Sequence, residues 1–143
     1  MLQEIQYNSQ CQPLYEAASY IIENVNGDII VSYCKKDAIV AVDRFGLFRY
    51  VYSGRNNDLD VGPVVNDTKG RIFVADYKGD KIHILDGVGK FLQYIDSQAI
   101  KNPCAMCIIP GGEIIVGESQ TGIAKILKYS EPWCVIQYHV KIT

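Results

Sequence analysis

The chain has 143 residues, a formal net charge of −2 at pH 7, a hydrophobic content of 48% and a charged content of 21%. These values are typical of a globular protein with enough residues for the core of one domain, and they argue against extended disorder. The near-neutral charge provides no general attraction to nucleic acid or to an anionic membrane, so any partner must be recognised by local features.

The compartment is predicted from two sequence features. No apolar run reaches the roughly 18 residues of a membrane helix, and the polar start MLQEIQYNSQ lacks the apolar core of a secretion signal. We therefore expect a cytoplasmic protein. The cysteines are odd in number and mostly lie in or beside apolar runs, which predicts reduced, packed thiols. They are Cys11, Cys34, Cys104, Cys107 and Cys134.

Short strand patterns follow one another in repeated units. The first unit has a strand candidate at residues 20–23, followed by residues 27–52. This second segment aligns without a gap on residues 70–95, at an offset of 43, with nine identities in 26 positions. The identities fall on turns and strand centres, as in the pairs Asp43/Asp86 and Gly46/Gly89. Such agreement is far above chance and identifies an internal repeat.

The second and third units complete the pattern. The second has apolar runs at residues 63–66, 72–75, 82–85 and 91–95, separated by Gly and Asp, which predict four strands joined by tight turns. The third is degenerate, with strand candidates at residues 105–109, a repeat-like segment at 112–129 and a last strand at 134–139. Residues 2–16 overlay the last two strands of a unit.

A period of about 43 residues with four short strands is typical of a β-propeller blade. We therefore predict an all-β fold of about three and a half four-stranded antiparallel blades within a single domain, residues 1–143. The predicted parts are the end of a preceding blade (2–16), two blades (17–54 and 55–96) and a degenerate last blade (97–140).

This number of blades is below the roughly four of the smallest closed propellers. The chain is therefore expected to form a partial propeller or open arc, with apolar sheet surface exposed at both ends. We favour a fragment of a larger propeller. The alternative is self-association, in which another chain closes the arc.

The run Gly-x-Ile-x-Val-Ala-Asp followed by Asp-x-Ile-x-Ile-x-Asp-x-x-Gly-x-Phe-Leu, between Gly70 and Leu92, resembles the NHL repeat. Neighbouring segments are similar to the C-terminal blades of invertebrate tripartite-motif NHL proteins. The resemblance implies a six-bladed propeller that follows RING, B-box and coiled-coil modules, whose RING confers ubiquitin ligase activity. It also implies that the propeller recognises a protein partner or, in some members, single-stranded RNA.

Enzymatic chemistry is the least supported interpretation. Cys104 and Cys107 form a lone CxxC pair without a second pair or a nearby histidine, so we predict neither a metal site nor a cofactor. Asp43 and Asp86 precede x-x-Gly and are expected to close turns. His83, between two isoleucines, is expected to make a polar contact between blades. A metal-dependent propeller lyase or lactonase is thus a weak alternative, and any ligase activity would lie in a RING domain outside this sequence.

The candidate binding residues lie in the loops. In a propeller, the turns between the second and third strands share one face with the links between blades, and here these loops contain basic and aromatic side chains. An acidic protein segment could bind them by ion pairs around an aromatic anchor, or single-stranded RNA could bind by phosphate contacts and stacking. Acidic residues in the same loops favour the protein partner. The candidates are Lys35, Lys36, Arg55, Asn56, Tyr77, Lys78 and Lys101.

Overall fold

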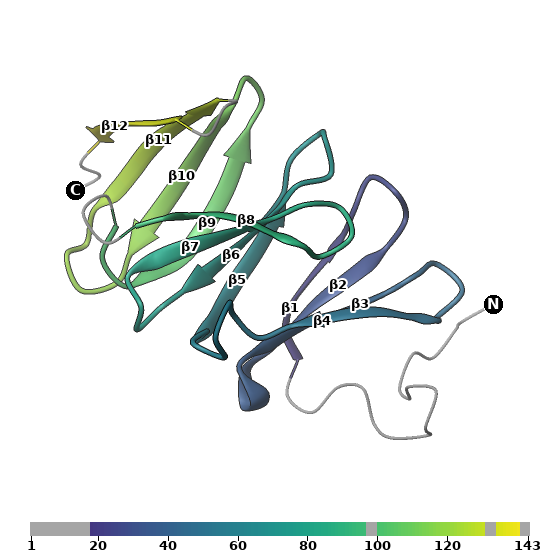
Figure 1. Cartoon of the computed structure of the whole chain (residues 1–143). Helices are drawn as coiled ribbons and strands as arrows, with labels where there is room; N and C mark the ends of the chain where they lie inside the picture. Colours follow the sequence, from purple (N-terminus) through teal and green to yellow (C-terminus); the bar gives the residue numbers. More distant parts are fainter. Residues whose placement is uncertain (1–17, 97–99, 131–133, 141–143) are drawn as a thin grey trace.

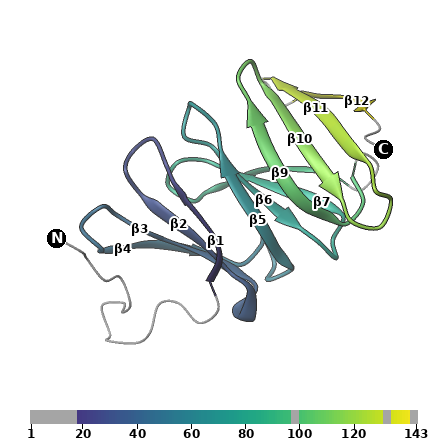
Figure 2. The ribbon, with the colours of Figure 1, turned by 180° about the vertical axis from the view of Figure 1, so that it is seen from behind.

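The computed structural model describes residues 18–96, 100–130 and 134–140. Within these ranges the chain forms three antiparallel sheets of four strands each, connected in sequence order, which confirms the predicted all-β fold and the partial propeller. Figure 1 shows the three sheets fanned out as consecutive blades, and Figure 2 shows the same order from behind. The predicted end of a preceding blade, residues 2–16, lies outside the described residues.

The strands have the following bounds. Blade 1 contains β1 (Ala18–Glu23), β2 (Ile29–Tyr33), β3 (Ala38–Val42) and β4 (Phe48–Tyr52). Blade 2 contains β5 (Val61–Asn66), β6 (Ile72–Asp76), β7 (Lys81–Leu85) and β8 (Phe91–Ile95). Blade 3 contains β9 (Pro103–Ile109), β10 (Glu113–Glu118), β11 (Ala124–Ser130) and β12 (Cys134–Val140). A short 3-10 turn, η1 (Cys34–Lys36), joins β2 to β3.

The sequence repeat corresponds to equivalent positions in the sheets. Ile72 pairs with Leu85 between β6 and β7, and Ile114 pairs with Leu127 between β10 and β11. The degenerate third repeat therefore keeps the strand register of the second.

Every residue of β3 and of β6 is buried, because the middle strands of a blade are covered on both faces. This explains why their sequences are continuous apolar runs rather than alternating patterns.

Two apolar layers join the blades. Ile30, Ile39 and Tyr52 of blade 1 pack on Val74 of blade 2 in the first layer. Phe73 lies on the other face of blade 2, in a second layer that includes residues of blade 3 such as Ile114. Burial of these side chains supplies the main attraction between neighbouring sheets. The relative positions of the loops are thus set by packing between blades.

The loops gather at two opposite ends of the blades. One end, which we call the loop face, contains the turns at residues 34–37, 77–80 and 119–122, with links at 53–60 and 100–102. Hydrogen bonds join them, as from the Tyr77 N–H to the Asp60 carbonyl at 3.0 Å. The other end, the hairpin face, contains the turns at residues 24–28, 67–71 and 110–112, with 43–47 and 86–90.

The repeated aspartates close turns on the hairpin face, as predicted. The Asp86 carboxylate accepts hydrogen bonds from the N–H groups of Val88 and Lys90, at 3.0 and 2.9 Å. Asp43 makes the same pair of bonds in blade 1. Gly89 completes the turn with a positive φ of 87°, a conformation that glycine adopts without steric cost. These carboxylates are therefore structural.

The prediction of packed thiols is wrong for three cysteines. Cys34, Cys104 and Cys107 are exposed. Cys34 lies in the η1 turn, and the other two lie on β9, whose middle residues are not covered by a neighbouring strand on the inner side of the arc. Apolar sequence context did not reveal that β9 is a first strand with one open edge. The side chains of Cys11 and Cys134 lie outside the described part of the chain.

The part of the chain that the structure describes contains no helix with the length and apolar character needed to cross a membrane.

One face of blade 1 carries exposed apolar side chains, those of Ile21 and Val51. Ile21 alternates along β1 with Ile22, which packs toward blade 2. The exposed residue therefore lies on the sheet face turned away from blade 2, in agreement with an open arc.

Candidate functional site

The main chain around Tyr77 is fixed by the links on both sides of blade 2. The N–H of Lys78 donates to the Asp60 carboxylate at 3.1 Å, and the Asn102 side-chain amide donates to the Tyr77 carbonyl at 3.1 Å. Asp60 belongs to the link before blade 2, and Asn102 belongs to the link after it. The turn that presents Tyr77 and Lys78 is therefore held in place before any partner arrives, which reduces the entropy lost on binding.

The side chain of Tyr77 lies between blades 2 and 3. It is half-buried, and its hydroxyl lies 3.0 Å from the Ser119 hydroxyl in the corresponding turn of blade 3. Tyr77 also lines a small cavity of about 290 Å³ at the inner side of the loop face, with Tyr20 of β1, Pro63 of β5 and Pro103 of β9. The lining of this cavity thus includes aromatic and proline side chains from all three blades.

Two of the lysines predicted to bind a partner lie on the same face as Tyr77. Lys78 is exposed, directly after Tyr77. The Lys101 side chain is 59% exposed, and its ammonium lies 3.7 Å from the Asp80 carboxylate, a distance that leaves most of its hydration intact. The Lys101 N–H is fixed by the Glu118 carboxylate at 2.8 Å. Both ammonium groups are accessible to a partner while their main chain is held.

Lys35 and Lys36 lie on η1 at the blade 1 end of the same cavity. Both are exposed, and the preceding Cys34 lines the cavity. The Lys36 ammonium lies 5.9 Å from the centre of the Tyr33 ring, within the range of a weak cation–π contact. The structure therefore places these lysines on the rim shared with Tyr77.

Arg55 and Asn56 are separated from this group. They lie on the link that crosses the outer strands of blade 2, where the Arg55 guanidinium lies 5.2 Å from the centre of the Phe91 ring. The Asn56 N–H donates to the Asp58 carboxylate at 3.4 Å. Of the seven candidates, Tyr77 lines the small cavity, the four lysines lie on the surrounding turns and links, and Arg55 and Asn56 form an outer pair over β8.

The outer pair adjoins two polar residues that the sequence interpretation missed, Lys81 and Tyr94, which meet at Asp58. Asp58 accepts hydrogen bonds from the Lys81 ammonium at 3.1 Å and from the Tyr94 hydroxyl at 3.3 Å. Partial burial raises the pKa of the Asp58 carboxyl, but the bonds from Lys81 and the Asn56 N–H outweigh it and hold the pKa at about 2. Asp58 is therefore anionic at neutral pH. Tyr94 and Lys81 are strand residues, and the candidate binding residues were chosen from the loops alone, so neither was among them.

His83 makes the predicted polar contact between blades. Its Nδ1 lies 2.6 Å from the Tyr52 hydroxyl of blade 1, and its Nε2 lies 2.9 Å from the Asp76 carboxylate of blade 2. Burial, with smaller contributions from Tyr94 and two carboxylates, raises the pKa of the Tyr52 phenol well above its ordinary value. The phenol therefore keeps its proton, and hydrogen bonds link Tyr52 of blade 1 through the His83 ring to Asp76 of blade 2.

This network lies in the interior of the protein. The side chains of His83 and Asp76 have no exposed surface. Asp76 also accepts hydrogen bonds from the N–H groups of Asp60 and Gly79, at 3.2 and 3.0 Å. Among the residues that the structure describes, no three His, Cys, Asp or Glu side chains lie together as potential metal ligands.

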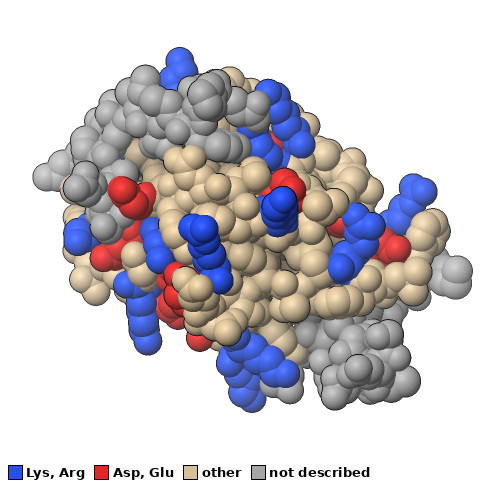
Figure 3. Space-filling view, viewed as in Figure 1, with Lys and Arg blue, Asp and Glu red and all other residues tan. Residues whose placement is uncertain are grey.

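The surface charge is mixed rather than of one sign. Figure 3 shows Lys and Arg side chains distributed over the visible face, with Asp and Glu among them. On the loop face, Asp60 and Asp80 accept main-chain hydrogen bonds from Lys78 and Asn102, so these acids help to form the framework. The protruding lysine ammonium groups therefore contribute local positive charge without producing an extended basic field.

Comparison with known proteins identifies the class. No family model and no curated protein sequence matches the chain. Among solved structures, it is similar to a catalytically inactive virginiamycin B lyase from Staphylococcus aureus, with a TM-score of 0.71 and 16% identity over 88% of this chain and 42% of that one. It is also similar to the Pan2 WD40 domain of Neurospora crassa, with a TM-score of 0.67 and 14% identity over 88% and 38% of the two chains.

A third similar structure is a Bacteroides fragilis protein assigned as a 6-phosphogluconolactonase, with a TM-score of 0.71 and 14% identity over 87% of this chain and 39% of that one. The four-stranded blades and these similarities define a β-propeller fold. The chain spans about two fifths of the length of these three solved structures, from 38% to 42%. It is therefore a partial propeller, and at these identities the likeness concerns the fold alone.

Proposed function

We propose that this chain is a non-catalytic binding module whose loop face recognises a protein partner. The observation that supports this most is the position of Tyr77, a half-buried aromatic side chain on a turn that both neighbouring links hold by hydrogen bonds. Rigid aromatic side chains at the centre of a polar rim are typical anchors of protein interfaces. The exposed Lys78 and Lys101 supply such a rim.

The partner segment is proposed to be acidic. The acids of the loop face are engaged by the protein itself, since Asp58 pairs with Lys81 at 3.1 Å and Glu118 with Lys125 at 2.8 Å. Lys35 and Lys78 extend from the same face without an acidic partner among the described residues. Acidic side chains around an apolar or aromatic residue would complement this surface, mainly by accelerating and orienting association.

The resemblance of residues 70–92 to the NHL repeat supports a more specific proposal. The chain would form the C-terminal blades of a longer tripartite-motif protein in the cytoplasm, and the partner would be a substrate of the ligase modules. A lyase or lactonase role has less support, because His83 and Asp76 are buried and bonded to each other. RNA binding has less support because acidic residues lie among the basic ones.

Replacement of Tyr77 by alanine together with Lys78 by glutamate is expected to abolish recovery of the partner. The double variant removes the aromatic anchor and reverses one rim charge while leaving the main-chain hydrogen bonds available. Loss of a hot-spot aromatic typically costs about 2 kcal/mol or more of binding free energy, a factor of about thirty in affinity. Quantitative pull-down from cell extract, with wild type and variant compared protein by protein, measures the effect.

The matched control is Arg44→Glu, a charge reversal at an exposed position in the 43–47 turn of the hairpin face. It is expected to leave recovery of the partner unchanged.

The Arg55→Ala variant tests whether the outer pair, Arg55 and Asn56, belongs to the same binding surface. Equal recovery of every protein by wild type and by the Tyr77 and Lys78 double variant would refute the proposal. Filter binding of single-stranded RNA that weakens with charge removal at Lys35 and Lys78 would favour RNA recognition instead.

A further inference from the structure

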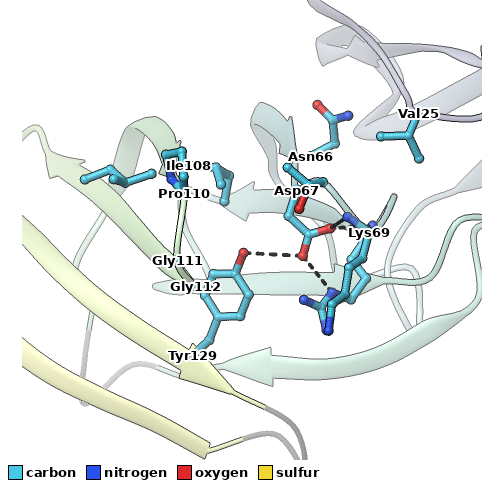
Figure 4. Close-up of a pocket in the computed structure, with 12 residues that line it drawn as sticks. Val25, Asn66, Asp67, Lys69, Ile108, Pro110, Gly111, Gly112 and Tyr129 are labelled. Atoms are coloured by element: carbon cyan, nitrogen blue, oxygen red, sulfur yellow. Dashed lines mark hydrogen bonds and ion pairs between the residues drawn. The ribbon is translucent and has the colours of Figure 1, made fainter.

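A larger cavity lies on the hairpin face, at the end of the blades opposite the proposed partner surface. Its volume is about 690 Å³, within the range of roughly 300–1,000 Å³ that is usual for ligand pockets. The turns at residues 67–71 and 110–112 form its two sides, and Tyr129 of β11 lies between them (Figure 4). Neither turn belongs to the loop face, so the proposed function leaves this cavity unexplained.

The one acid in the cavity lining is fully engaged. Asp67 accepts hydrogen bonds from the N–H groups of Lys69 and Arg71 at 3.0 and 2.9 Å, and its other oxygen lies 2.6 Å from the Arg71 Nε. The Tyr129 hydroxyl donates to that same oxygen at 3.3 Å. Burial, followed by the charge of Asp67, raises the pKa of Tyr129 to about 12, so this phenol remains a donor.

These contacts have an electrostatic consequence. The Asp67 carboxylate is buried and paired with Arg71, so it presents little negative charge to the cavity. Lys69 is exposed at the cavity edge, and its ammonium has no acidic partner among the described residues. The cavity lining therefore has one available positive charge and favours an anion over a cation.

The opposite side of the cavity is apolar. Ile108 and Pro110 come from the end of β9 and the following turn. Val25 extends from the blade 1 turn on the other side, next to Gly70 and the Lys69 turn, with 62% of its surface exposed (Figure 4). Apart from Gly111 and its two chain neighbours, no atom of the described residues lies within 4 Å of the point where a side chain at Gly111 would begin, so space remains beside this wall. A ligand that places a charge at Lys69 would cover these apolar side chains with any hydrocarbon part it possesses.

We propose that this cavity binds a carboxylate attached to an apolar group. The carboxylate pairs with the Lys69 ammonium, and the apolar part packs against Ile108 and Pro110. Such a group can belong to a free carboxylic acid or to the C-terminal residue of a peptide. The site lies on the face opposite Tyr77, so its ligand can bind together with a partner on the loop face.

Titrations of the full chain with hexanoate, followed by amide chemical shifts in two-dimensional NMR spectra, test this proposal. We expect saturable shifts at residues 67–71 and 110–112. Two probes separate the two parts of the ligand, since acetate lacks the apolar chain and hexanamide lacks the charge. Both are expected to bind at least fivefold more weakly than hexanoate. A peptide ending in leucine with a free carboxylate, compared with its C-terminal amide, tests the peptide source.

The Lys69→Gln variant is expected to weaken hexanoate binding by about three- to fivefold, as for loss of a partly exposed ion pair. Lys90→Gln, at an exposed position in the 86–90 turn of the same face, is the matched control and should bind hexanoate as wild type does. Equal binding of hexanoate and hexanamide, an unchanged affinity in Lys69→Gln, or shifts located outside the two turns would each overturn the proposal.

Discussion

Replacement of His83 by leucine is expected to lower the free energy of unfolding by about 3 kcal/mol, because it leaves two buried polar groups without their partner. The Tyr52 hydroxyl loses its acceptor at the interface between blades 1 and 2, and the Asp76 carboxylate loses its contact with Nε2. Leucine fills much of the vacated volume, so the loss reflects hydrogen bonding more than a cavity. Urea denaturation of wild type and variant measures the difference.

Two further variants make this prediction specific. Tyr52→Phe removes one buried hydrogen bond and is expected to cost about 1 kcal/mol in the wild-type background, but little in the His83→Leu background, because the two side chains act as a unit. Tyr94→Phe removes a hydroxyl that contacts Asp58 in a solvent-exposed position, and it should change stability by less than about 0.5 kcal/mol. A His83→Leu variant as stable as wild type would show that the network does not stabilise the fold.

Replacement of Phe73 by alanine is expected to destabilise the chain by about 3–5 kcal/mol, the usual cost of removing a buried aromatic side chain. Phe73 is fully buried between blades 2 and 3, and its ring centre lies 5.0 Å from that of Tyr129. The vacated volume is expected to remain largely empty, because the sheets on both sides are held by their own hydrogen bonds. A lower urea midpoint with little change in slope is the expected result.

The Phe73 variant also tests how the blades depend on one another. In a repeat architecture each unit contacts mainly its neighbours, so loss at one interface is expected to affect the adjoining blade most. Amide hydrogen exchange should accelerate in β10 and β11 of blade 3 more than in β2 and β3 of blade 1. Val88→Ala, at an exposed position in the 86–90 turn, is the control and should change neither quantity. Uniform acceleration in all three blades would contradict this independence.

The sequence was sufficient to predict the blades because each strand leaves a local signal. The paired aspartates and glycines of the hairpin turns recur at a fixed offset, and the buried middle strands are continuous apolar runs. His83 was also predictable as a contact between blades, since it interrupts such a run. Its partner Tyr52 was not, because the equivalent residue in blade 2 is Ile95, so the repeat contains no trace of the contact.

The candidate surface was only partly predictable, for a geometric reason. The loops containing the seven residues were correctly assigned to one face, but the path of a link across its blade depends on three-dimensional packing. The contact of Arg55 with the Phe91 ring separates it from Tyr77, although the loops that contain the two residues lie on the same face. The hairpin-face cavity was missed because Lys69 and Pro110 come from turns of different blades, which only the packing of blades 2 and 3 brings together.

Recognition of a partner by the loop face is tested most directly by amide hydrogen exchange of the chain alone and in complex with the protein that its pull-down recovers. Slower exchange in the complex is predicted at residues 34–37 and 77–80, with no change in the hairpin-face turns at 67–71 and 86–90. Protection confined to the hairpin face or to the outer sheet faces would contradict the proposal. So would a complex that forms equally well without Tyr77 and Lys78.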